Sequence, residues 1–244
     1  MALSRPPCLS GRFFIGCEQS LDRPDRMCAI SPDAIVITHA HPDHAFGLKQ
    51  GAPCPVYATV ETWHALARMP IDLRELVRPG TAFEVGAVSF KAFTVAHSVI
   101  APAVGYRISV AEKSFFYVPD VLRIPGSMEV LDGIDLYIGD GARLEHPFVR
   151  GKGDQASGHA SIHEQLTWCD DAKVRRATFT HCGTPIIKSD HAAMEAVVGS
   201  LGRALGITAN VARDGEEIIV GGSRAEVGTI TYPKSSQGIT NLAR

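Results

Sequence analysis

The sequence lacks the features that mark several large classes of protein. No apolar stretch approaches the roughly 20 residues of a membrane-spanning helix, and residues 1–10 have no apolar core of a signal peptide. The formal net charge is only −2, without a basic run or a basic patch interleaved with aromatics, so binding to long nucleic acid is not expected. These absences favour a cytoplasmic protein with no membrane partner, and they leave a homodimer open.

Cysteine is present without a recognisable pattern. None of the six cysteines forms a Cys-x-x-Cys pair, which disfavours a structural zinc knuckle. Free thiols in a reducing compartment are therefore the expectation. Cys182 follows a histidine discussed below, and packing is the simpler explanation for it.

The most informative segment, residues 38–44, reads Thr-His-Ala-His-Pro-Asp-His. Three imidazoles and one carboxylate in six positions are ligand types that metal ions use. The preceding residues 34–37 are apolar and mostly β-branched, which predicts a buried strand. The histidine cluster is therefore expected where a strand ends and a turn begins.

The spacing within this cluster indicates two metal ions rather than one. His39 and His41 can face one way on an extended backbone. Pro42 then bends the chain, so that Asp43 and His44 point to a neighbouring position. Two such pairs of ligands fit a two-metal centre, with ions roughly 3.5–4 Å apart.

Further ligand-type residues come directly after apolar, strand-like runs. They are His97, Asp120 and His181, which follow residues 92–96, 114–119 and 177–180. Loops at the ends of strands often carry functional sites, because the sheet fixes their position.

These motifs, in this order, resemble those of the metallo-β-lactamase fold family of metallohydrolases. The resemblance covers about residues 12–220 and implies an α+β fold, an αβ/βα four-layer sandwich. It also implies seven ligands in two sets that share a bridging carboxylate. The sets are His39, His41 and His97 for one ion, and Asp43, His44 and His181 for the other, with Asp120 bridging. Such ligands suit two divalent ions, Zn²⁺ first, with Mn²⁺ or Fe²⁺ open.

A chain that is 45% hydrophobic and 20% charged can form a substantial core. We expect a single domain over residues 1–220 and a loose tail over 221–244, which is rich in Gly, Ser and Thr. Strands are predicted at 12–15, 34–38, 56–58, 82–85, 87–93, 103–110, 115–118, 134–138, 177–180, 207–212 and 217–220. Helices are predicted to begin at 45 and to cover 59–68, 161–171 and 192–204.

A catalytic pair is expected beside the metals. The strand ending at Gly139 delivers Asp140, and His159 stands just before a predicted helix. Asp140 could fix the tautomer of His159, which would then act as a general acid; the alternative is that both residues cap local structure. The catalytic candidates are therefore Asp43, His159 and Asp140, with Asp43 also a metal ligand. His146 lies in the loop 141–157, where a solvated histidine is the simpler interpretation.

The phosphodiesterase branch of the family is the most similar. Its members, such as ribonuclease Z, resemble this chain at Gly105-Tyr106-Arg107, at Asp140 and at Gly158-His159-Ala160-Ser161. Ribonuclease Z proteins carry a long transfer-RNA arm before the bridging Asp, and here a predicted hairpin fills that connection. The chain is therefore more similar to the phosphoribosyl cyclic phosphodiesterases, without the extra N-terminal cysteine ligands that those usually have.

The resemblance thus implies a metal-dependent phosphodiesterase that acts on a small or cyclic nucleotide-like substrate through a metal-bridging hydroxide. Two alternatives stay open. One is hydrolysis of a thioester, lactone or other acyl bond on the same two metals. The other is a non-catalytic, metal-binding accessory protein, because a fold does not determine a function.

Overall fold

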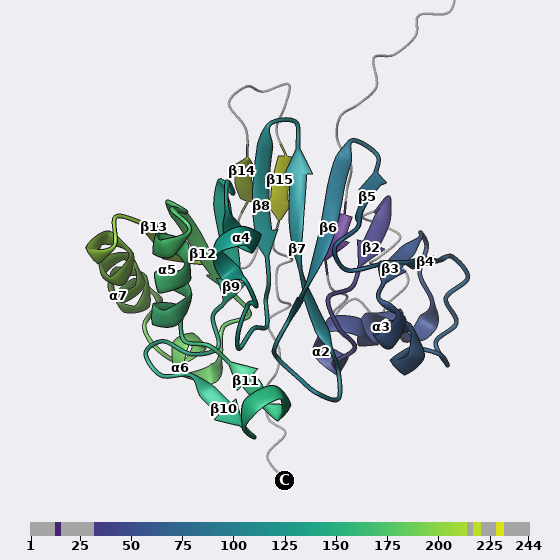
Figure 1. Ribbon diagram of the computed structural model, residues 1–244, viewed down its shortest axis with the longest axis horizontal. Coiled ribbons are helices and arrows are strands. Elements are labelled where there is room, and N and C mark those ends of the chain that lie inside the picture. Colours follow the sequence, from purple (N-terminus) through teal and green to yellow (C-terminus); the bar gives the residue numbers. More distant parts are fainter. Residues whose placement is uncertain (1–12, 16–31, 214–216, 221–227, 232–244) are drawn as a thin grey trace, which may run out of the picture.

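Two β-sheets lie face to face in the computed structural model, which describes residues 13–15, 32–213, 217–220 and 228–231 (Figure 1). The smaller sheet is parallel, and its strands in spatial order are β1 (Phe13–Ile15), β2 (Ala34–Val36), β3 (Val56–Ala58) and β4 (Arg74–Leu76). The larger sheet has, in spatial order, β13 (Thr208–Val211), β12 (Arg176–Thr180), β9 (Leu136–Asp140), β8 (Lys113–Tyr117), β7 (Ala103–Val110), β6 (Val88–Val95) and β5 (Ala82–Val85).

Helices cover the outer faces of both sheets. On the side of the smaller sheet lie α2 (Pro42–Ala45), a 3-10 helix (Phe46–Gln50) and α3 (Val60–Ala65). On the side of the larger sheet lie α4 (Ser127–Leu131), α5 (Ile162–Asp171), α6 (Thr184–Ile187) and α7 (His191–Ala204). There are also two short antiparallel pairs: β10 (Phe148–Arg150) with β11 (Ser157–His159), and β14 (Glu217–Val220) with β15 (Gly228–Thr231). A 3-10 helix (Gly153–Gln155) connects β10 to β11.

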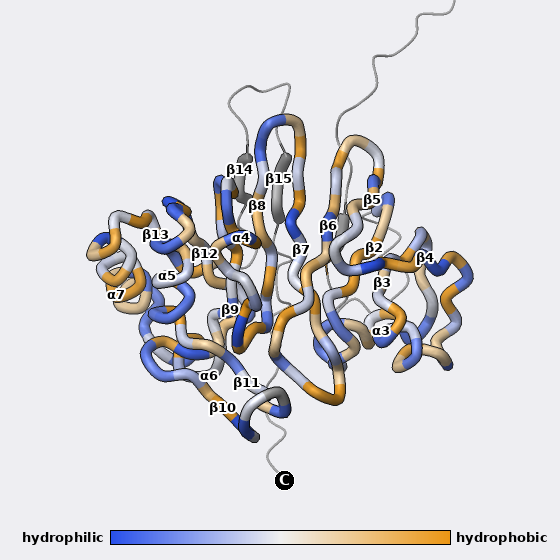
Figure 2. The backbone as a smooth tube through the Cα atoms, in the orientation of Figure 1, coloured by the Kyte–Doolittle hydropathy of each residue, from blue (hydrophilic) through white to orange (hydrophobic). Residues whose placement is uncertain are grey.

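The hydrophobic core has three parts that separate four layers. In β2, Ala34 and Val36 face the larger sheet, whereas Ile35 packs under α2 and α3, as expected for the two-residue period of a strand. A third cluster lies between the larger sheet and helices α5 and α7, where Phe116 and Phe179 are fully buried. Hydrophobic segments accordingly run along β7, β8 and β9 through the middle of the molecule (Figure 2). The predicted α+β, four-layer sandwich is confirmed.

Strand direction brings the polar ends of several strands to one edge. β8 pairs in parallel with β9, and β9 with β12, while β6 runs the same way as β8 because each pairs antiparallel with β7. At this edge the two sheets are joined by hydrogen bonds, from Val104 N–H to the Thr38 carbonyl (3.0 Å) and from Tyr106 Oη–H to the Ile37 carbonyl (3.0 Å). The segment after β2 is thereby held against the larger sheet.

The helix predicted from residue 45 begins earlier in the structure. We expected it from residue 45, but α2 starts at Pro42, and His44 and Ala45 both donate backbone N–H bonds to the His41 carbonyl at 3.0 Å. Proline suits the first helical position, since it lacks an N–H that would have no partner there. Asp43 and His44 therefore lie in a helix and not in the preceding turn.

Most longer predicted elements are present, with shifted ends. Helix α3 starts after Thr59, whose side chain accepts a bond from the Thr62 N–H, but it ends at Ala65 and not near residue 68. Within the tail that was expected to be loose, Gly228–Thr231 pairs with β14; the domain boundary at 220 and the tail both stay predictions.

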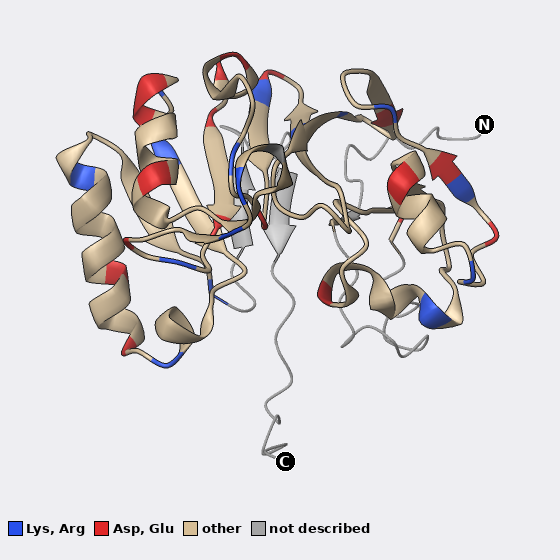
Figure 3. Cartoon of the chain, turned by 60° about the horizontal axis from the view of Figure 1, so that its bottom comes forward, with Lys and Arg blue, Asp and Glu red and all other residues tan. Residues whose placement is uncertain are grey.

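Several short elements were not predicted. They are β4, α4, β10, β11, α6, β15 and a 3-10 helix at Gly153–Gln155, each of three to five residues. In the described part of the chain, no helix is long and apolar enough to cross a membrane. Basic and acidic residues are interspersed over the coloured elements of Figure 3.

Candidate metal centre

Three imidazoles converge at the edge where the two sheets are joined. His41 Nδ1 lies 3.0 Å from His39 Nε2 and 3.3 Å from His97 Nε2. Nitrogen ligands about 2.0–2.1 Å from a tetrahedral zinc ion are about 3.3 Å apart. The predicted first set of ligands is therefore brought together at a spacing that suits one ion.

Contacts on the far side of two of these rings determine which nitrogen faces the centre. His97 Nδ1 donates to the Gly158 carbonyl at 2.9 Å, which leaves Nε2 with its lone pair toward His41. His39 Nδ1 lies 3.1 Å from Thr38 Oγ1. Partners of this kind orient the histidines of metal sites in proteins.

The second predicted set also forms a cluster. His181 Nε2 lies 3.3 Å from His44 Nε2 and 3.2 Å from Asp43 Oδ2. The ligand atoms of these three residues all lie within 4.8 Å of one another. The residues of this set differ in burial: the side chain of Asp43 is 59% exposed and that of His44 only 7%.

Asp120 lies between the two sets. Its Oδ2 is 2.6 Å from His44 Nε2 and 3.5 Å from His39 Nε2, and its Oδ1 is 3.1 Å from His181 Nδ1. The side chain is 2% exposed, yet neither oxygen has a hydrogen-bond partner of acceptable geometry among the described residues. A buried carboxylate without such partners is costly, and cations on both sides would remove that cost. The donor set thus fits two divalent ions with a shared carboxylate.

The electrostatics of the site favour neutral imidazoles in the first set. Burial, and secondarily the neighbouring His44, lowers the pKa of His39 to about 2. Burial also lowers the pKa of His41 and of His97, although Asp120 opposes the change in both. Neutral rings keep a lone pair available for a metal.

Negative charge is concentrated at the second set. Burial alone would raise the pKa of Asp120, but His181 and His44 outweigh it and hold that pKa well below its usual range. A hydrogen bond from His181 likewise lowers the pKa of Asp43. Burial opposes charge on His181 as well, yet the Asp120 and Asp43 carboxylates raise its pKa to about 11. The two carboxylates and the His181 imidazole thus favour one another's charged forms.

His181 also has an unusual backbone. It follows β12 with φ = +53°, a left-handed conformation that is uncommon for a residue with a side chain. Such conformations concentrate at functional sites, where the surrounding structure maintains them. The turn leaves one ring nitrogen near Asp120 and the other near Asp43.

The predicted Asp–His pair is present beside the cluster. His159 Nδ1 donates to Asp140 Oδ2 at 2.7 Å, and it lies 3.4 Å from Asp120 Oδ1. Burial would lower the pKa of His159, but Asp140 raises it overall. The contact through which Asp140 was predicted to orient His159 is therefore present in the structure.

Further hydrogen bonds fix both the side chain and the backbone of Asp140. Its Oδ2 also accepts from Val121 N–H at 2.9 Å, and its Oδ1 accepts from Ala142 N–H at 2.8 Å. Gln165 of α5, which is fully buried, accepts from the Asp140 N–H (2.9 Å) and donates to its carbonyl (2.7 Å). The alternative that Asp140 only caps a loop accounts for the Ala142 contact, but not for the bond with His159.

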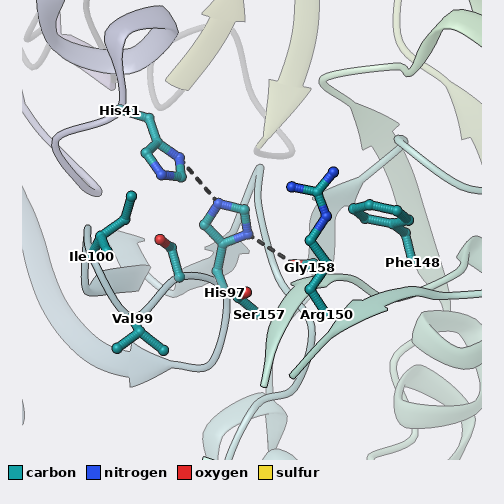
Figure 4. Close-up of a pocket in the computed structure, with 9 residues that line it drawn as sticks. His41, His97, Val99, Ile100, Phe148, Arg150, Ser157 and Gly158 are labelled. Carbon is teal, nitrogen blue, oxygen red and sulfur yellow. Dashed lines mark hydrogen bonds between the residues drawn. The ribbon is translucent and has the colours of Figure 1, made fainter. Parts of the chain in front are cut away.

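A pocket of about 290 Å³ opens beside the first set of imidazoles (Figure 4). His41 and His97 form part of its wall. The rest comes from two segments, the loop after β6 and the β10–β11 pair: Ser98, Val99, Ile100, Phe148, Arg150, Ser157 and Gly158.

The sequence analysis missed two kinds of residue here. Residues 141–157 were interpreted as a loop, so Phe148 and Arg150 of β10 were not considered as site residues. The only local signal for them was an aromatic residue two positions before an arginine. Gln165 looked like an ordinary helix residue. His146, which was interpreted as a solvated loop histidine, is exposed, and so are His64, His163 and His191.

Comparisons with known proteins agree with this geometry. Residues 18–182 match the beta-lactamase superfamily domain. Among curated proteins, the exodeoxyribonuclease WalJ of Streptococcus pneumoniae is 32% identical over 116 residues, which cover 41% of this chain and 42% of that protein. The chain thus spans less than half the length of this relative.

Solved structures share the fold at low sequence identity. A diphosphatase from the PhnP family has a TM-score of 0.60 and 24% identity, covering 83% of this chain and 76% of its own. The metallo-beta-lactamase fold protein YhfI from Bacillus subtilis has a TM-score of 0.62 and 15% identity, covering 82% and 83%. The short form of human tRNase Z has a TM-score of 0.51 and 16% identity, covering 71% and 82%.

Proposed function

We propose that this chain, which belongs to the metallo-β-lactamase superfamily of hydrolases, is a phosphodiesterase that uses two divalent ions to hydrolyse a small, nucleotide-like phosphodiester. The observation that carries the proposal is the pair of imidazole clusters joined by Asp120, with the His159–Asp140 pair directly beside it. Zinc is the proposed metal, because imidazole and carboxylate are its usual nitrogen and oxygen ligands, with manganese and iron as alternatives.

Seven residues would bind the two ions. His39, His41 and His97 would hold one ion, Asp43, His44 and His181 the other, and Asp120 both. When bound, two such ions supply a nucleophile from water near neutral pH and neutralise charge on phosphoryl oxygens. Asp43, the most exposed of the seven ligands, would meet incoming solvent.

His159 would act on the leaving group. Because Nδ1 is engaged by Asp140, Nε2 is the ring atom free to hold a proton for a departing oxygen. Asp140 would keep that tautomer and stabilise the protonated ring. The thiolate of a thioester can leave without a proton, whereas an alkoxide cannot, so an acid beside the metals favours a phosphodiester over a thioester.

The test is turnover by metal-replete protein on three substrates in parallel: bis(p-nitrophenyl) phosphate, an acyl thioester and a DNA duplex with free ends. We expect hydrolysis of the phosphodiester well above that of the thioester. The DNA arm addresses the partial likeness to an exodeoxyribonuclease, and faster degradation of DNA would make DNA ends the substrate. Preference for the thioester would refute the proposal, and inactivity on all three would indicate an accessory protein.

A further inference from the structure

The pocket beside the first imidazole set has one cation in its wall. Among the described residues that line it, Arg150 alone carries a permanent charge. Its guanidinium carbon stacks 4.9 Å from the centre of the Phe148 ring. Such stacking restricts where the guanidinium can lie and leaves its N–H groups free for an anion.

Arg150 is also tied to the metal centre through the backbone. It pairs with Ser157 across β10 and β11, and the next residue, Gly158, accepts the 2.9 Å bond from His97. The short ladder therefore fixes the position of the Arg150 backbone relative to a proposed metal ligand. Figure 4 shows Arg150 and Phe148 on one side of His97.

The opposite wall includes two aliphatic side chains. Val99 and Ile100 lie on the other side of His97 in Figure 4, with 47% and 89% of their surfaces exposed. A ligand in this pocket would thus meet aliphatic side chains on one side and a single permanent cation on the other. A volume of about 290 Å³ is at the lower end for ligand pockets, which suits one sugar and one phosphate better than a polymer.

We infer that Arg150 binds a second, terminal phosphate of the substrate, carried by the part that stays attached to the scissile phosphorus. The inference rests on the proposed function. The second phosphate is assigned to the part that stays on the scissile phosphorus, because His159, the proposed acid for the leaving group, is not in the pocket wall. Arginine recognises phosphate through paired N–H donors, and no other side chain of this wall carries a lasting positive charge.

Matched chromogenic esters test this directly. Thymidine 5′-(p-nitrophenyl phosphate) and its 3′-phosphorylated form have the same scissile bond and leaving group. We expect the 3′-phosphate to raise kcat/KM about tenfold, chiefly through KM, the lower end for a hydrogen bond to a charged group because Arg150 is exposed. In Arg150→Gln the ratio between the two esters should fall to near one.

Arg143→Gln is the matched control. Arg143 also stacks on Phe148, at 5.1 Å, but does not line the pocket, so this variant should keep the wild-type ratio. A third ester, with the 3′-phosphate methylated, separates a terminal phosphate from a nucleic-acid strand. Equal gain from the methylated ester would overturn the assignment to a terminal phosphate, and an unchanged ratio in Arg150→Gln would overturn the role of Arg150.

Binding measurements keep this inference separate from the proposed function. Calorimetry compares thymidine 3′,5′-bisphosphate with thymidine 5′-monophosphate on metal-replete wild type and Arg150→Gln, without any turnover. Tighter binding of the bisphosphate to wild type alone supports the pocket even if no ester is hydrolysed, in which case only the proposed function fails. Equal affinities in both proteins would refute the pocket even if the esters are turned over.

Discussion

Replacing His159 with alanine should slow hydrolysis by an amount that depends on the leaving group. For an alkoxide leaving group, which needs a proton, the loss should be roughly 10²–10⁴-fold, equivalent to about 3–5 kcal/mol of transition-state stabilisation. We expect the upper part of this range, because Asp140 Oδ2 at 2.7 Å favours the protonated ring. For p-nitrophenolate, a stable anion, the loss should be much smaller.

The assay measures kcat/KM of wild type and His159→Ala on a p-nitrophenyl ester and on the corresponding alkyl ester of the same nucleotide. His163→Ala is the control, since His163 is an exposed histidine of α5 only four positions away. It should change neither rate. Metal content of all three proteins is measured in parallel, because His159 Nδ1 lies 3.4 Å from Asp120 Oδ1.

Two outcomes would refute this reasoning. Equal losses on both esters would mean that His159 positions the substrate or supports the fold, and that the acid lies elsewhere. Loss of metal in His159→Ala would make it a ligand, and the division of the seven ligands would then be wrong.

Three further predictions concern the residues around the metals. Asp120→Ala should lower both metal content, measured by elemental analysis, and activity, because it removes the carboxylate that faces both sets; full retention of two ions would contradict the bridging role. Asp140→Asn should give a weaker, leaving-group-dependent defect than His159→Ala, and should lower the free energy of unfolding by about 1–3 kcal/mol, since an amide nitrogen would face one of three N–H donors. Urea titration measures that loss. Ser161→Ala should cost about 1 kcal/mol in the same titration, because Ser161 and Glu164 form a capping box at the start of α5; an unchanged midpoint would show that the cap contributes nothing.

The clustering of the seven candidate residues could be predicted because each depends on a local pattern. A strand-forming run followed directly by His97, Asp120 or His181 is visible in the sequence, and parallel strands bring such ends to one edge. The cluster after β2 needed no long-range information at all. The structure adds the distances that bring the two sets around Asp120.

What could not be predicted depends on tertiary contacts. Strand β10 has only three residues, and its sequence carries no clear periodicity, so nothing local placed Arg150 near His97. Gln165 becomes informative only when α5 packs on β9 and its amide meets the Asp140 backbone. Helix α2 was misplaced because the histidine cluster was interpreted as a turn, whereas Pro42 was already the first helical residue.

The origin of the seven proposed ligands has a consequence for folding. Four of them follow β2 of the smaller sheet, and three follow strands of the larger one. Each ion would therefore cross-link the two halves of the sandwich, His39 with His97 and His44 with His181, the latter pair 137 residues apart. Separating the halves would require releasing the ions, so metal at a thousand times its Kd would add about 4 kcal/mol per site. Amide hydrogens of β2 and β7 should then exchange more slowly in the metal-loaded protein. Those of α7, which carries no ligand, should slow only as far as global unfolding becomes rarer.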